Sequence, residues 1–199
     1  MQIEFCVPVL VPKAASSAAE VQAAQGLLDQ CVKDLRRMDR RVDLSIRGSS
    51  ATFQLPAVFH VRSSLTENAA ALDRLMFCLT ELDTDYRLRR PGLVWLYDHP
   101  LRYARTVVWD TTAALYARGG GDCKSLTATR MAEYWAAGIP AKCFFRFLPP
   151  ELNQKYQYQY HLLFLPGAGS KGFECPSKLK GMSPYENSYF IDQPQRKAA

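Results

Sequence analysis

Three consecutive glycines, Gly119–Gly121, precede an Asp-Cys-Lys-Ser segment and constrain the fold more than any other feature of the chain. Glycine adopts backbone angles that side chains forbid, so the run predicts a sharp elbow. Asp122 is a good N-cap, and the apolar spacing after it predicts a helix over 123–137. A glycine and a proline soon after are typical of a helix end. Cys123 is therefore expected in the first turn of a helix, directly behind a flexible elbow.

The start of a helix favours a reactive thiol. Unpaired backbone N–H groups and the positive end of the helix dipole meet there. Both favour the thiolate, which is the nucleophilic form of cysteine, and the same N–H groups can bind a developing oxyanion. The adjacent Lys124 would stabilise the thiolate further. A thiolate also needs a proton acceptor and donor, and His161, 38 residues after Cys123 on an expected strand, is our candidate.

A third residue should orient the imidazole. Glu174 is the nearest acid, on the strand expected after the turn that follows His161. Cross-strand neighbours lie about 4.5–5.5 Å apart at Cβ, so we expect Glu174 to contact His161. Register leaves two alternatives open: a slip of one residue would bring Cys175 to that place, and Asp192 is a further acid that could substitute.

The ordered set of segments resembles the transglutaminase-like superfamily of papain-type folds. The family pattern is a Gly-Asp-Cys helix start, a Gly-Ile-Pro-Ala turn, a His-led strand, a Pro-Gly turn and an Asp-Pro-Ser/Thr-like motif. Here these segments read GGGDCKS, AAGIPAKCFFRF, YHLLFLPGAGSKG and FECPS, in the same order over about residues 105–180. Cys175 stands where the family has its aspartate, and residues 1–100 match nothing in the pattern.

The resemblance implies a cysteine enzyme that transfers an acyl group at amide bonds, as a protease, an amidase or a transglutaminase. Cys123 would attack the carbonyl carbon, His161 would protonate the leaving amine, and water or an amine would resolve the thioester. This chemistry needs no metal and no cofactor, and its partner is a peptide or protein substrate. The alternative is a non-enzymatic binding or structural module on the same fold. Such domains also occur in bacterial and phage proteins, and a virion or assembly component is one form that this module could take.

The order of predicted elements indicates an α+β fold. Strands are expected over residues 2–12, 41–48, 51–62, 141–148, 158–166 and 173–177. Helices are expected over residues 15–40, 65–83, 101–117 and 123–137. We divide the chain into an N-terminal α/β elaboration over 1–100, a transglutaminase-like core over 101–190, in which the catalytic-type helix packs on an antiparallel sheet, and a polar tail over 191–199.

Composition narrows the classes of protein further. With 48% hydrophobic and 22% charged residues, the chain is typical of a globular protein. No apolar run reaches the roughly 18 residues of a membrane span, and the first residues alternate rather than form a signal peptide, so we expect a cytoplasmic location.

The net charge of +6 is a mild excess, and the segments KDLRRMDRR and RLRRP are expected to be solvated basic surfaces rather than a nucleic-acid site. The chain has no Cys-x-x-Cys pair to indicate zinc.

Overall fold

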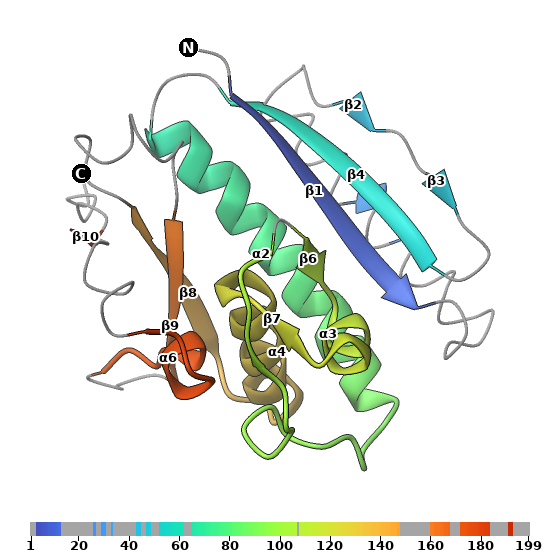
Figure 1. The fold of residues 1–199 in the computed structure, drawn as a ribbon, viewed down its shortest axis with the longest axis vertical. Coiled ribbons are helices and arrows are strands. Elements are labelled where there is room, and N and C mark those ends of the chain that lie inside the picture. The colour runs from blue at the N-terminus through green and yellow to red at the C-terminus, as the bar shows by residue number, and fades with distance from the viewer. Residues whose placement is uncertain are drawn as a thin grey trace.

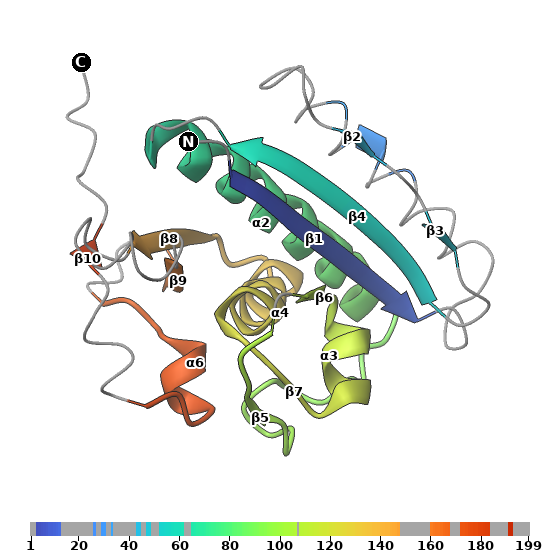
Figure 2. The same cartoon turned by 45° about the horizontal axis from the view of Figure 1, so that its top comes forward.

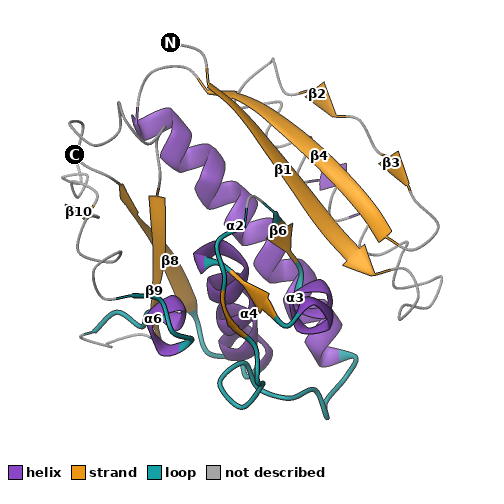
Figure 3. Ribbon diagram, viewed as in Figure 1, coloured by secondary structure: helices purple, strands orange, loops and turns teal. Residues whose placement is uncertain are grey.

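The computed structural model describes residues 3–12, 26, 29–30, 33, 43–44, 47–48, 52–61, 65–106, 108–147, 160–167, 172–183 and 191–192. These residues form a mixture of helices and small sheets, so the α+β prediction is confirmed at that level (Figure 3). No helix among them is long and apolar enough to cross a membrane. Of the helix predicted over 15–40, only residues 26, 29–30 and 33 are described, and all four are helical.

Two long antiparallel strands dominate the first sheet. β1 (Ile3–Pro12) pairs with β4 (Thr52–Val61) along their full lengths, as expected from their β-branched and aromatic residues. Short strands β2 (Asp43–Leu44) and β3 (Arg47–Gly48) also pair with β4. On the other side of β1, β6 (Trp109–Asp110) adds in parallel. Residues from beyond position 100 therefore complete a sheet built by the N-terminal part of the chain.

Two packed helices form the centre of the molecule. α2 (Leu65–Leu88) lies beneath the β1–β4 sheet, and α4 (Cys123–Ala136) packs on the opposite side of α2 (Figures 1 and 2). α2 runs five residues beyond the predicted end, whereas α4 begins at the predicted residue. The buried apolar side chains of α2 recur at helical spacing: Leu72, Leu75, Met76, Leu79 and Leu82.

A second sheet covers another flank of α4. β8 (Ala141–Phe147) lies between β9 (Tyr160–Pro166) and β10 (Ile191–Asp192), and both neighbours are antiparallel to it. Met131 of α4, Ala141 of β8 and Phe164 of β9 form one buried apolar cluster. The helix of Cys123 therefore packs beside the antiparallel β8–β9 pair, whereas the expected pairing of the strands over 158–166 and 173–177 is reduced to one bridge between Phe164 and Glu174.

The helix predicted over 101–117 is wrong. The structure instead forms β5 (Arg102–Tyr103), β6 and then the short helix α3 (Thr112–Arg118). Trp109 is 2% exposed in the β6–β1 pairing, and tertiary burial of this kind overrides local helical spacing. The chain turns helical only at Thr112, whose N–H donates to the buried Asp83 carboxylate of α2 at 2.6 Å.

The strand predicted over 173–177 is also shorter than expected. Only Glu174 makes a β-bridge, to Phe164 of β9, and helix α6 (Pro176–Leu179) begins two residues later. Proline favours the first positions of a helix because its φ is already helical and it has no N–H to satisfy. Pro176 therefore ends the strand that the alternating pattern suggested.

Candidate functional site

Each glycine of the elbow has its own steric reason. Gly119 ends α3 with φ 75°, in the left-handed region, and its N–H donates to the Leu115 carbonyl at 3.1 Å. A Cβ at Gly120 would lie 3.0 Å from the Arg102 carbonyl oxygen, and one at Gly121 would lie 2.4 Å from Leu115 Cδ1. Gly120–Gly121 forms β7, which pairs in parallel with β5. The elbow predicted from the glycine run is confirmed, and side chains there would force the neighbouring segments apart.

Cys123 is the first residue of α4 and is buried, at 6% exposure. Asp122 caps the helix as predicted, since its carboxylate accepts the Lys124 N–H at 3.3 Å. Within the first turn of the helix, the Ser125 hydroxyl accepts the N–H of Asp110 in β6 at 2.9 Å. The start of α4 is thus held both by its own cap and by the first sheet.

Four charged side chains surround this helix start. The Lys124 ammonium pairs with the Asp122 carboxylate and donates to the Thr106 carbonyl at 2.6 Å. Asp110 is fully buried and lies 2.9 Å from Arg118 Nη1 of α3. Burial raises the pKa of Asp110 to about 6, against the opposing effects of Arg118 and Lys124. Burial also raises the pKa of Asp122, and Lys124 again opposes the shift. The Lys124 charge that we expected to serve the thiolate is therefore committed to a carboxylate and a carbonyl.

β9, the strand of His161, runs in the same direction as α4. At the C-terminal end of the helix, Trp135 Nε1 donates to the Ala141 carbonyl at 3.1 Å, so β8 starts there. The Gly167 N–H, just after β9, donates to the Pro140 carbonyl at 2.7 Å. The end of β9 therefore lies beside the end of α4, and its beginning lies toward the helix start.

Counted from the apolar cluster that α4 and β9 share, the positions of Cys123 and His161 both lie back toward the start of α4. Met131 and Phe164 meet in one cluster and provide a reference level. From Met131 back to Cys123 is about 12 Å, at 1.5 Å per helical residue. From Phe164 back to His161 is about 10 Å, at roughly 3.3 Å per strand residue.

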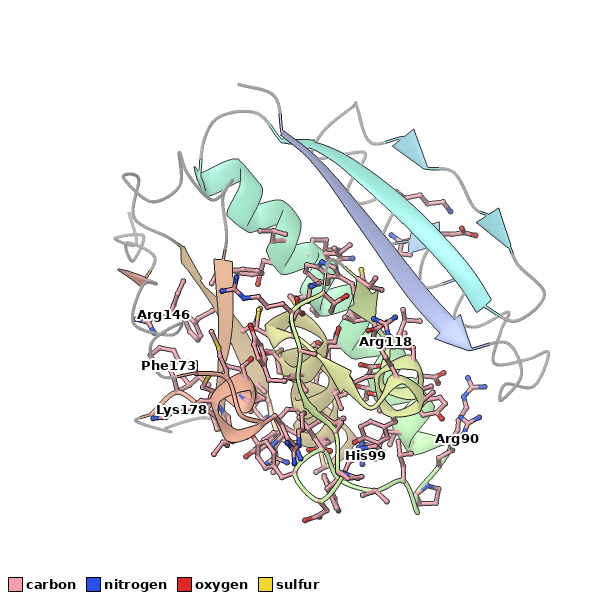
Figure 4. The ribbon with its side chains drawn as sticks, in the orientation of Figure 1. Arg90, His99, Arg118, Arg146, Phe173 and Lys178 are labelled. Atoms are coloured by element: carbon pink, nitrogen blue, oxygen red, sulfur yellow. The ribbon has the colours of Figure 1, made fainter. Side chains whose placement is uncertain are left out.

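The register of the sheet assigns a face to the His161 position. His161 pairs with Arg146 of β8. Phe164 lies on the face that packs against α4, and positions an odd number of residues apart in a strand belong to opposite faces. The position of His161 therefore shares the outer face of the sheet with Phe144 and Arg146. Arg146, Phe173 and Lys178 are seen at this side of the molecule in Figure 4.

Glu174 contacts residues other than His161, its expected partner, in the structure. It pairs with Phe164, three residues along β9 from His161, because the connection from β9 returns the chain at that level. Its carboxylate accepts hydrogen bonds from three side chains of two other segments, namely Tyr97, Arg130 (2.8 Å from Nε) and Tyr134 (3.2 Å from Oη). The structure thus joins Glu174 to the middle of α4, and its contact with His161 stays a prediction.

The two alternatives for the third position also have definite places. Cys175 is the N-cap of α6, where its Sγ accepts the Lys178 N–H at 3.5 Å, and burial raises the pKa of its thiol. Asp192 pairs with Arg146, on the side of β8 opposite to β9. Its backbone is therefore about 10 Å from that of His161, which is two strand spacings.

A buried ionic network behind the site was missed from the sequence. Glu133 of α4 is 1% exposed and accepts from Arg87 Nη2 at 2.9 Å, from Arg130 Nη1 at 2.6 Å and from the Leu96 N–H at 2.6 Å. Burial raises the pKa of Glu133, and these three donors oppose the shift. Arg87 belongs to the RLRRP segment that we expected to be solvated, and for this residue the expectation is wrong. The sequence signal that could have predicted this burial is the helical spacing of α2, which places Arg87 on the inner side of the helix.

Among the described residues, no group of three or more His, Cys, Asp and Glu side chains could hold a metal ion. Comparison with protein-family models, curated proteins and solved structures finds no match to the chain.

Proposed function

We propose that the protein is a papain-like, transglutaminase-type cysteine enzyme that transfers an acyl group at amide bonds. The observation that carries the proposal is the place of Cys123, the first residue of a buried helix that follows a sterically required glycine elbow. The backbone N–H groups of a helix start and the helix dipole both favour the thiolate of a cysteine at that position. The parallel course of β9 supports His161 as its partner, since the strand begins toward the same end of the helix.

In the proposed reaction, the Cys123 sulfur forms a bond to the amide carbonyl carbon of a peptide or protein. The backbone N–H groups at the start of α4 stabilise the oxyanion. The C–N bond then breaks as the His161 imidazolium gives its proton to the leaving nitrogen. Water or a second amine attacks the thioester, its proton passes to His161, and the thiolate is released. The proposal assigns no third residue, because Glu174 has other described partners.

The test is selective alkylation of the native full-length chain. A low concentration of iodoacetamide near neutral pH is applied, and peptide mapping gives the rate at each of the six cysteines. Cys123 should react fastest, and His161→Ala should slow it at least about tenfold. His99→Ala is the matched control, because His99 stacks on Tyr116 away from the proposed pair. A Cys123 no faster than the other cysteines, or one indifferent to His161→Ala, would contradict the proposal.

A second candidate is a non-enzymatic binding or structural module on the same fold, such as a virion or assembly component. One observation favours it: the His161 position shares a face with Arg146 rather than with Phe164, which packs against α4. For such a module, His161→Ala would leave the alkylation rate of Cys123 unchanged. The same experiment therefore separates the two functions.

A further inference from the structure

Lys124 is buried to an extent that is rare for lysine. It is 4% exposed, and lysines are almost never fully buried unless they are paired. Removing an ammonium from water costs several kcal/mol, which the surroundings must recover. Here the Asp122 carboxylate and the Thr106 carbonyl at 2.6 Å are its partners. Because burial of this ammonium is unfavourable, we ask what Lys124 does at its position, directly after Cys123.

The partners of Lys124 belong to a regular set of bonds between the elbow and the segment 102–106. The Arg102 N–H donates to the Gly119 carbonyl at 3.2 Å, and the Ala104 N–H donates to the Gly121 carbonyl at 2.9 Å. Two residues further, the Thr106 backbone both accepts from the Lys124 ammonium and hydrogen-bonds to Asp122. The hydrogen bond from Lys124 to Thr106 is therefore the last in the series of contacts that join segment 102–106 to the elbow and the start of α4.

The same contact balances charge beside the thiol. Asp122 directly precedes Cys123, and an unpaired carboxylate there would oppose the formation of a thiolate. Lys124 directly follows and pairs with that carboxylate. Among the described residues, Asp110 of β6 and Arg118 of α3 also face this cluster, and these two pair with each other. The helix start is thus surrounded by two matched ion pairs rather than by one net charge.

We propose that Lys124 is a positioning residue for Cys123: it fixes the glycine elbow against Thr106 and cancels the charge of Asp122 beside the thiol. The inference rests on the proposed role of Cys123 as nucleophile. It predicts opposite effects for the two members of the pair, which a purely structural contact would not produce. Removing Lys124 leaves a negative charge near the sulfur, and removing the charge of Asp122 leaves a positive one.

The experiment measures the rate of Cys123 alkylation by iodoacetamide between pH 5 and 10 in the full chain. Lys124→Met should move the pH of half-maximal rate upward and lower the rate at pH 7 about tenfold, since charges a few ångströms apart interact by a few kcal/mol at the edge of a protein. Asp122→Asn should move the profile downward. The double variant, which keeps both shapes and neither charge, should return to within about threefold of the parent. Lys33→Met, at an exposed lysine, is the control for loss of one positive charge.

Lys124→Met and Asp122→Asn profiles that move in the same direction, or not at all, would overturn the inference. So would a double variant as slow as Lys124→Met. If Lys124→Met does not fold by circular dichroism, Asp122→Asn and the double variant still decide, because the downward shift must appear in the first and be cancelled in the second. Failure of the proposed function has a different signature, since the profiles would shift as expected while His161→Ala left the alkylation rate unchanged.

Discussion

Asp83 offers a direct measure of what a buried charge costs this fold. It is 1% exposed on α2, and its carboxylate accepts the N–H of Thr112, the first residue of α3. Burial raises its pKa to about 7, although Thr112, Arg87 and Thr129 all oppose the shift. The ionised form is therefore less favourable in the folded chain than in the unfolded chain. We choose Asp83→Asn as the perturbation, because the amide oxygen still accepts from Thr112.

The sign and size follow from proton linkage. Between pH 4 and 7 the folded state binds more protons at Asp83 than the unfolded state, so the free energy of unfolding falls as pH rises. A shift from 3.8 to about 7 corresponds to about 4 kcal/mol, at 1.36 kcal/mol per unit. Asp83→Asn removes this dependence. The unfolding free energy of the variant relative to the parent should therefore rise by about 4 kcal/mol from pH 4 to pH 8.

Urea denaturation across that pH range provides the measurement. The test depends on how the difference in unfolding free energy between variant and parent changes with pH. If the asparagine N–H₂ lacks a good acceptor, it lowers the stability of the variant by the same amount at every pH and leaves that change unaffected. Asp85→Asn is the matched control on the same helix: Asp85 is 39% exposed and pairs with Arg89, so its effect should stay within about 0.5 kcal/mol at every pH. A difference for Asp83→Asn that stays flat would show that ionising Asp83 costs the fold nothing, and one that falls with pH would show that the ionised carboxylate is stabilising; either result would refute the reasoning.

Two further substitutions test the residues that support the candidate site. In urea denaturation, Glu174→Ala should lower the free energy of unfolding by about 3 kcal/mol, because the alanine removes a partly buried partner of Arg130, and Glu174→Gln should lower it by less. If Glu174→Ala instead lowered the rate of Cys123 alkylation without lowering stability, Glu174 would have a role at the reactive centre. Gly121→Ala should cost about 2 kcal/mol or more in the same assay, since its Cβ would overlap Leu115, whereas Gly92→Ala, with open space around it, should change stability by less than about 0.5 kcal/mol. Equal effects at the two glycines would contradict the steric account of the elbow.

The elements that could be predicted from the sequence are those with strong local signals. The apolar spacing of α2, the Asp122 cap and the glycine run each reflect interactions within a few residues of each other. The helix predicted over 101–117 failed because its extended part is held by distant residues. Trp109 pairs with Val9 of β1, about 100 positions earlier, and no local pattern contains that partner.

The candidate site divides in the same way. The place of Cys123 at a helix start follows from the six or seven residues around it, and the structure agrees. The third position depends on the register between β9 and the segment of Glu174, which is set by how the connection closes. The structure pairs Glu174 with Phe164 rather than with His161, and this three-residue offset moves the carboxylate to the middle of α4. A one-residue error already exchanges the faces of a sheet, so register cannot be read from spacing alone.

The charged side chains around α4 are paired with one another, and this pairing allows the start of the helix to be buried. Seven charged side chains lie within or beside its buried surface, and each has a described partner of opposite sign: Lys124 with Asp122, Arg118 with Asp110, and Glu133 with both Arg87 and Arg130. An unpaired charge at any of these places would cost several kcal/mol. Because the pairs compensate one another, they add little net charge to the electrostatic field of the helix N–H groups and dipole at Cys123. Burial then strengthens that field, since interactions of this kind are weakened mainly by water.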